Sequence, residues 1–327
     1  MPPAPRLGFE VLGEPAVPAM TAIARQTEAL GYDSIWLAET RFTRDAVTTA
    51  AAVVGATSRV RVATAVTNPF TRGAVLTAVT AATLDEAAGG RFILGLGPGS
   101  PTVLARQGIG FDRPLTRLRE TVEVVRRLLA GDEVWFAGET LSVAGARLDF
   151  TPPRPAIPIY LGVTGPKALA LAGEIADGVI LNGFVSLTYT RRAIEIVRSA
   201  AHAAGRDPDA IEITASVTVA IDEDGDRARD AVRPLIATYL AQFPHIARES
   251  GVPAELLERI ARVHSDVGPA AAAALVDDAI VAELSGAGTV DEVRAALAQR
   301  RQAGVHLPNV SLADSGMAKW LGALISA

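Results

Sequence analysis

The sequence predicts a closed (β/α)8 TIM barrel with insertions after the fourth and seventh strands. Short apolar runs of β type alternate with longer amphipathic helices through most of the 327 residues. Eight such runs can be counted, and most are apolar on both faces, which is typical of a buried parallel sheet. An open doubly wound sheet would show the same alternation, but eight units in one chain of this length favour closure into a barrel.

The first half of the chain supplies four strand–helix units and the first insertion. Glycines follow two of the helices, at Gly31 and at Gly89–Gly90, where this residue commonly ends a helix. A β-hairpin is expected within residues 132–150. The expected strands are 7–11, 33–37, 59–66 and 91–96, and the expected helices are 15–30, 45–56, 74–87 and 116–129.

The second half resumes the alternation and contains the second insertion. Residues 224–284 are expected to be helical, with breaks near Pro244 and Pro253. The expected strands are 157–161, 178–182, 211–221 and 305–312, and the expected helices are 166–175, 188–204 and 289–303, with a short one around Trp320. Because the alternation continues after each insertion, we expect residues 1–327 to form a single domain.

Composition excludes several classes of function. The net charge of −5 gives no reason to expect nucleic acid or an anionic membrane as a partner, so a small-molecule substrate is expected. No apolar run approaches the about 20 residues needed to span a bilayer, and no signal peptide is visible, which predicts a cytoplasmic protein. The chain has no cysteine, and its four histidines are scattered, so no metal site is predicted.

In a barrel of this kind the active site lies at the carboxyl ends of the strands. Two carboxylates, Glu10 and Glu39, fall there and are the candidate catalytic residues. A buried carboxylate is rare unless it is paired or functional, and a raised pKa would suit Glu10 as a proton donor. The alternatives are that Glu10 lies in water at its strand end, and that Arg41 and Arg44 simply pair with Glu39.

Two glycine-rich loops follow strands at the same end, at residues 95–100 and 162–167. Glycine lets backbone N–H groups approach a phosphate closely, and Pro166 and Lys167 suit the start of a helix facing an anion. The first loop fails the dinucleotide fingerprint, because Pro98 interrupts it and Ser100 replaces its third glycine. Either loop alone could be an ordinary tight turn. The segment from Asn68 to Arg72 has two readings, a capped turn or a contact to the cofactor.

Several segments together resemble the bacterial luciferase-like superfamily, and within it they are most similar to methylenetetrahydromethanopterin reductase and its deazaflavin-dependent relatives. They are residues 31–36, 66–72, 82–85 with 89–91, 95–99, 165–167, 172–179 and 287–293. The resemblance implies a homodimer that binds coenzyme F420 across the mouth of the barrel. It also implies a non-prolyl cis peptide bond between Ala65 and Val66, forming a bulge behind the deazaflavin ring.

Carried over residue by residue, the resemblance assigns proton donation or substrate orientation to Glu10. The expected cofactor-binding residues are Thr64, Ala65, Val66, Thr67, Asn68, Gly97, Pro98, Gly99, Ser100, Gly162, Val163, Thr164, Gly165, Pro166, Lys167 and Asn182. The chain departs from the family at Glu39–Thr40, where Asp-His is common, and at Arg72–Gly73–Ala74, where Arg-His-Pro is common. These departures leave the substrate open.

The predicted activity is hydride transfer between coenzyme F420 and a small organic substrate. The alternative within the superfamily is an FMN-dependent monooxygenase that uses reduced flavin and oxygen. Two further alternatives are a barrel that binds a cofactor without turnover and a phosphosugar isomerase, which would need a base on the sixth or seventh strand.

Overall fold

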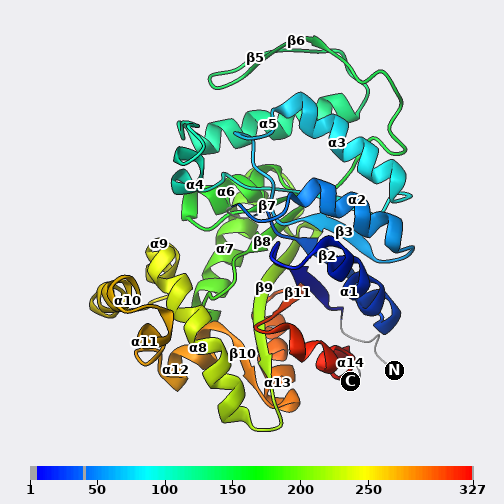
Figure 1. Ribbon diagram of the computed structural model, residues 1–327. Coiled ribbons are helices and arrows are strands. Elements are labelled where there is room, and N and C mark those ends of the chain that lie inside the picture. Colours follow the sequence, from blue (N-terminus) through cyan, green and yellow to red (C-terminus); the bar gives the residue numbers. More distant parts are fainter. Residues whose placement is uncertain (1–5, 40–41, 326–327) are drawn as a thin grey trace.

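Eight parallel strands close into a barrel in the computed structural model, which describes residues 6–39 and 42–325 (Figure 1). Each strand pairs with the next around the ring, and β11 pairs with β1 to close it. The prediction of a (β/α)8 barrel is therefore confirmed. In ring order the strands are β1 (Gly8–Val11), β2 (Ser34–Leu37), β3 (Arg61–Thr64), β4 (Phe92–Leu96), β7 (Ile159–Gly162), β8 (Gly178–Leu181), β9 (Glu212–Ile221) and β11 (Leu307–Leu312).

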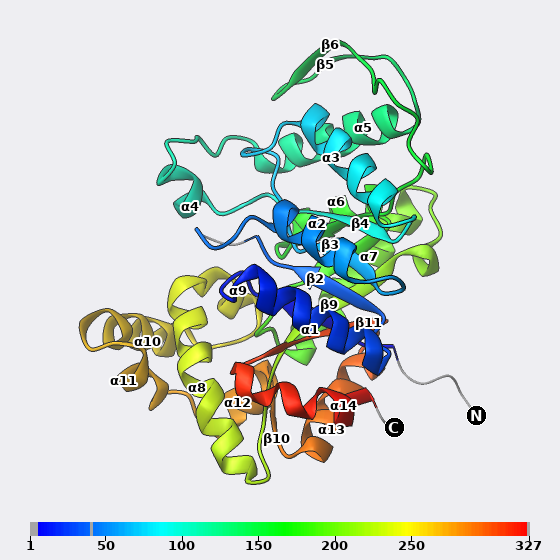
Figure 2. The same ribbon diagram turned by 45° about the vertical axis from the view of Figure 1, so that its right-hand side comes forward.

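The helices that connect the strands cover the outside of the barrel (Figures 1 and 2). Their apolar sides pack on the outer faces of the strands and form the main core. All of the connecting helices lie within a few residues of the predicted ranges. They are α1 (Val17–Leu30), α2 (Ala46–Ala56), α3 (Ala74–Ala87), α5 (Pro114–Leu129), α6 (Pro166–Ile175), α7 (Leu187–Ala203) and α13 (Val290–Gln302), with α14 (Leu321–Ile325) at the end of the described chain.

Both insertions are present where they were predicted. The hairpin of β5 (Val134–Ala137) and β6 (Ser142–Ala146) lies beyond α5, at the edge of the molecule (Figure 1). The second insertion packs around its own small core. Its helices are α8 (Gly225–Gln242), α9 (Pro244–Glu249), α10 (Ala254–Asp266), α11 (Pro269–Ala273) and α12 (Asp278–Leu284).

Among the described residues, three short elements were not predicted from the sequence. They are α4 (Pro101–Ala105), the 3-10 helix η1 (Pro208–Ala210) and the strand β10 (Gly286–Gly288). The ten-residue β9 pairs with β8 along its first half, and β10 adds beside its second half, opposite Val219–Ile221. A three-residue strand with two glycines has no apolar run, so only its pairing with β9 makes it a strand.

The barrel interior is filled by a small apolar cluster. Trp36 belongs to it, and Glu10 is the residue beside Trp36 in the β1–β2 register. Residues side by side in a sheet share a face, so Glu10 also faces the interior. The cluster comprises Trp36, Ala63, Ile93, Tyr160, Ile180 and Leu307.

Charged side chains close the amino-terminal end of the barrel. Arg6 contacts Asp33 at 2.7 Å and Glu212 at 2.6 Å, and Arg61 contacts Glu212 at 3.1 Å. The Tyr160 hydroxyl also donates to Glu212, at 2.6 Å. Burial alone would raise the pKa of Glu212, but Arg61 and its other partners lower it below its ordinary value. This end of the barrel is therefore sealed by groups that satisfy one another.

None of the helices in the described part of the chain is long and apolar enough to cross a membrane.

Candidate functional site

The predicted site residues gather at one end of the barrel, called here the barrel mouth. Glu10 lies on β1, Glu39 follows β2, and residues 64–68, 97–100, 162–167 and 182 follow β3, β4, β7 and β8. Because every strand of the ring runs in the same direction, their carboxyl ends meet there. The fold thus brings together residues that are far apart in the sequence.

Val66 joins the ends of three strands at the mouth. The peptide bond between Ala65 and Val66 is cis, as the resemblance implied. A Cβ atom added to Gly97 would lie 2.4 Å from Val66 Cγ2, and one added to Gly162 would lie 2.7 Å from Val66 Cγ1. Both glycines are therefore required for packing against Val66, a role that the sequence analysis did not foresee.

Part of the segment after β3 is occupied by internal hydrogen bonds. The Thr64 hydroxyl bonds to both the N–H and the carbonyl of Gly95, at 3.0 and 2.9 Å. Asn68 Oδ1 accepts from the amides of Phe70 and Thr71, both at 3.1 Å. Asn68 therefore caps a turn, as one of the two interpretations of this segment predicted. A contact between the segment and a cofactor stays a prediction.

Glu39 and Thr67 leave polar atoms without partners beside the mouth. Glu39 Oε2 and Thr67 Oγ1 are buried, and neither makes a hydrogen bond within the described residues. Burial raises the pKa of Glu39, although the nearby Thr67 hydroxyl and Arg72 act in the opposite direction. Buried polar atoms are normally satisfied, so this pair is suited to a polar ligand. Arg44 bonds to the Gly13 carbonyl at 3.4 Å, and Thr40 and Arg41 lie outside the described residues.

The loop from Gly162 to Lys167 opens α6. Pro166 is its first residue, and no side chain caps the helix at Gly165. The backbone N–H groups of this first turn are left for another acceptor. Lys167 is exposed, and it is one of only two lysines in a chain with 31 Lys and Arg residues. The loop can therefore present amides and one cation to an anion.

Glu10 lies among polar groups from three other elements. Burial raises the pKa of its carboxyl to about 7, although the nearby Ser216 hydroxyl of β9 opposes the shift. Tyr239 of α8 is close enough for the Glu10 charge to raise its pKa further, although burial is the larger cause. Asn182 donates from Nδ2 to the Tyr239 hydroxyl over 3.3 Å. Glu10 is therefore a carboxyl that can hold or release a proton near neutral pH.

Sequence reasoning missed Ser216 and Tyr239. Glu212, Thr214 and Ser216 are every second residue of β9 and therefore share one face of the strand. This period of two could have placed Ser216 inside the barrel. Tyr239 lies in the second insertion, and no sequence pattern indicates which helix of that insertion lies near the strand ends. Its ring packs at tilted angles against those of Phe184 and Phe243, with ring centroids 5.0 and 4.8 Å away. These rings give the Glu10 side of the mouth an aromatic wall.

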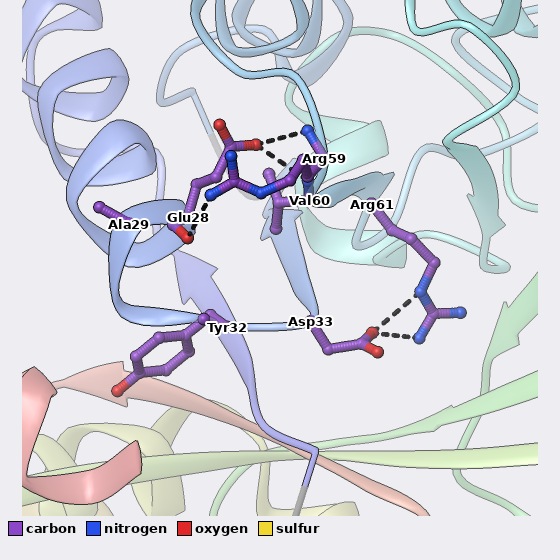
Figure 3. Close-up of a pocket in the computed structure, with 8 residues that line it drawn as sticks. Glu28, Ala29, Tyr32, Asp33, Arg59, Val60 and Arg61 are labelled. Carbon is purple, nitrogen blue, oxygen red and sulfur yellow. Dashed lines mark hydrogen bonds and ion pairs between the residues drawn. The ribbon is translucent and has the colours of Figure 1, made fainter. Parts of the chain in front are cut away.

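A hollow of about 420 Å³ lies at the opposite end of the barrel (Figure 3). Its charged groups are already paired. Glu28 accepts hydrogen bonds from the amides of Ser58, Arg59 and Val60, and Asp33 pairs with Arg61. These bonds lower the pKa of Glu28 to about 2, against the effect of burial. We therefore assign this hollow a structural role.

Comparison with known proteins agrees with this geometry. The family model described as luciferase-like monooxygenase matches residues 5–307. The chain belongs to this family. The prediction of an enzyme of the luciferase-like superfamily is thereby confirmed.

The relatives are enzymes named for coenzyme F420 or for a reductase. The chain is 32% identical to 5,10-methylenetetrahydromethanopterin reductase of Methanolobus tindarius, over 91% of each chain. It is 31% identical to F420-dependent glucose-6-phosphate dehydrogenase of Nakamurella multipartita, over 71% of this chain and 72% of that one. The solved structure of coenzyme F420-dependent tetrahydromethanopterin reductase from Methanopyrus kandleri superposes with a TM-score of 0.89 at 26% identity, covering 99% of this chain and 98% of that chain.

Proposed function

We propose that this protein is a coenzyme F420-dependent oxidoreductase that transfers a hydride between the deazaflavin and a small organic substrate. The relatives named above support the cofactor. The observation that carries the proposal is the position of Glu10. A carboxyl with a pKa of about 7 lies at the same end of the barrel as both glycine-rich loops.

The residues at the mouth fit such a cofactor. The polar parts of its ring system would meet the unpartnered Glu39 and Thr67 atoms, beside Val66. Its phosphate-bearing tail would meet residues 97–100 and the amides and Lys167 of the 162–167 loop. Asn182 lies on the opposite side, next to Tyr239. These assignments keep the predicted residue set, with Thr64 and Asn68 contributing chiefly through the backbone.

Coenzyme F420 supplies hydride transfer when it is bound. The protein contributes position and a proton. Glu10 would donate its proton to the substrate atom that becomes basic as the hydride arrives, and the nearby Ser216 hydroxyl would help to orient the carboxyl. A substrate with a polar double bond, such as C=N or C=O, takes up one hydride and one proton in this way. The relatives named as reductases favour a pterin-type substrate.

We further propose a homodimer formed through α2 and α3. Helices on the outside of a barrel normally present charged residues to water. The eleven residues of α2 include no charged residue, and the charges of α3 are confined to its last turn, at Asp85 and Glu86. Its outer face includes Leu76, which is 54% exposed. Apolar residues in such an uncharged patch are typical of a protein–protein interface.

Titration of the purified protein tests the cofactor directly. Oxidised coenzyme F420 and FMN are added separately, and binding is followed by the fluorescence of each. The proposal predicts saturable binding of coenzyme F420 that is much tighter than that of FMN. Tight FMN binding without any response to coenzyme F420 would favour the monooxygenase alternative.

A further inference from the structure

The 162–167 loop is held from behind by a residue outside the predicted site. Tyr189, on the first turn of α7, is buried, and its hydroxyl donates to the Thr164 carbonyl at 2.7 Å. Its own backbone N–H is bonded to Ser186, which caps the same helix. The hydroxyl therefore reaches the loop from a rigid element.

This bond sets the direction of the next amide. In a trans peptide unit the C=O and the N–H point in opposite directions. Because the Thr164 carbonyl is turned toward Tyr189, the Gly165 N–H is turned away from it. Nothing within 4 Å would meet a Cβ atom added to Gly165, so there is open space on its side-chain side. Within residues 6–39 and 42–325, no hydrogen bond from this N–H is present.

The helical insertion holds the start of α7 in turn. Arg192 lies over the Tyr189 ring at 5.7 Å and forms an ion pair with Glu249 of α9. Glu283 of α12 accepts from the Leu187 N–H at 3.0 Å. Tyr189 thus connects the 162–167 loop with the helical insertion, which also carries Tyr239.

We propose that Tyr189 is a positioning residue for coenzyme F420: it orients the 162–167 loop so that the loop amides face the anionic part of the cofactor. This inference rests on the proposed function. Tyr189 does not touch the reacting atoms. It acts through the Thr164–Gly165 peptide unit, and its loss should change affinity for the cofactor and leave the chemical step nearly unchanged.

The test compares Tyr189→Phe with Tyr160→Phe. Each change removes one buried hydroxyl that donates one hydrogen bond, but Tyr160 lies at the sealed end of the barrel. Fluorescence titration with oxidised coenzyme F420 should show about five-fold weaker binding for Tyr189→Phe, the effect of one lost hydrogen bond, and no change for Tyr160→Phe. The melting temperatures of both variants check that they fold.

Hydrogen exchange of the cofactor-free protein gives an independent readout. Amides of residues 162–168 should exchange faster in Tyr189→Phe than in the wild type or in Tyr160→Phe. Unchanged affinity together with unchanged exchange would overturn the positioning role, and so would equal weakening by both variants. A wild-type protein that does not bind coenzyme F420 would instead overturn the proposed function, while the exchange data would still decide whether Tyr189 orders the loop.

Discussion

Glu10 owes its chemistry to its place in the β1 strand. It shares the interior face of the barrel with apolar neighbours such as Trp36, so its carboxylate loses hydration and its pKa rises to about 7. The carboxylates of Glu28 and Glu120 have the opposite fate, because each accepts several hydrogen bonds from backbone amides and has a lowered pKa. The same type of side chain therefore has a raised pKa in one place, which suits the proposed proton donor, and accepts backbone hydrogen bonds in turns in the others.

Replacing Glu10 with Gln should remove the proton donor and keep the fold. In the wild type the protonated fraction of Glu10 falls as pH rises through about 7, so kcat/KM for substrate reduction should fall above that pH. Glu10→Gln should lose about 100-fold or more in rate and should lack this decline. The measurement is the pH profile of both proteins with the cofactor saturating.

Thermal unfolding separates this role from a structural one. A carboxyl whose pKa is raised by folding disfavours the folded state once pH exceeds its unfolded pKa, ordinarily 4.5, and the penalty is complete above about 7. Glu10→Gln should therefore be at least as stable as the wild type near pH 8. An unfolded variant, or a variant that keeps the wild-type decline in rate, would contradict the assignment.

Glu10 could be identified as a candidate from the sequence because an acidic residue inside an apolar strand is unusual. The sequence did not reveal the role of Gly97, since a glycine pattern does not say which neighbour occupies the space where Cβ would be. The structure shows that neighbour to be Val66. Gly97→Val should therefore disturb the packing of the β4 end against Val66 and lower the melting temperature, in addition to weakening cofactor binding.

At the scale of elements, strands and helices could be predicted closely because their signals are local. Helix α13 is an example, since Thr289 and Glu292 form a capping box whose three-residue spacing is visible in the sequence. The strand β10 and the packing of the second insertion against the barrel could not be predicted, because both depend on contacts with distant parts of the chain. The hydrogen bond between Tyr189 and Thr164 could not be predicted for the same reason.

The outer surface of α2 and of the first three turns of α3, which carries no charged residue, makes a testable prediction about assembly. Ala51 is exposed on α2, and Ala51→Glu should place a buried, unpaired charge in the dimer interface. Light scattering coupled to size exclusion should show a dimer for the wild type and a shift to monomer for this variant. Val267, 73% exposed in the second insertion, provides the control, and Val267→Glu should leave the dimer intact. A wild-type monomer, or dissociation by both variants, would contradict this interface.

At the scale of the whole molecule, the barrel separates two ends with different properties. Ion pairs between Arg6, Asp33, Arg61 and Glu212 satisfy the charges of the amino-terminal end. At the carboxyl end, Glu39 Oε2 and Thr67 Oγ1 have no hydrogen-bond partner among the described residues, and Glu10 has a raised pKa. That the predicted site residues meet at one end could be predicted from the sequence, because it follows from parallel strands. The ion pairs could not, because they join residues that are far apart in the sequence.

The structure of the protein crystallised with coenzyme F420 tests the central claim most directly. The account predicts that the deazaflavin ring lies beside Val66 at the barrel mouth, with the phosphate against residues 97–100 or 162–167 and Glu10 facing the ring. Density for the cofactor at the sealed amino-terminal end, or phosphate density away from both glycine-rich loops, would contradict it.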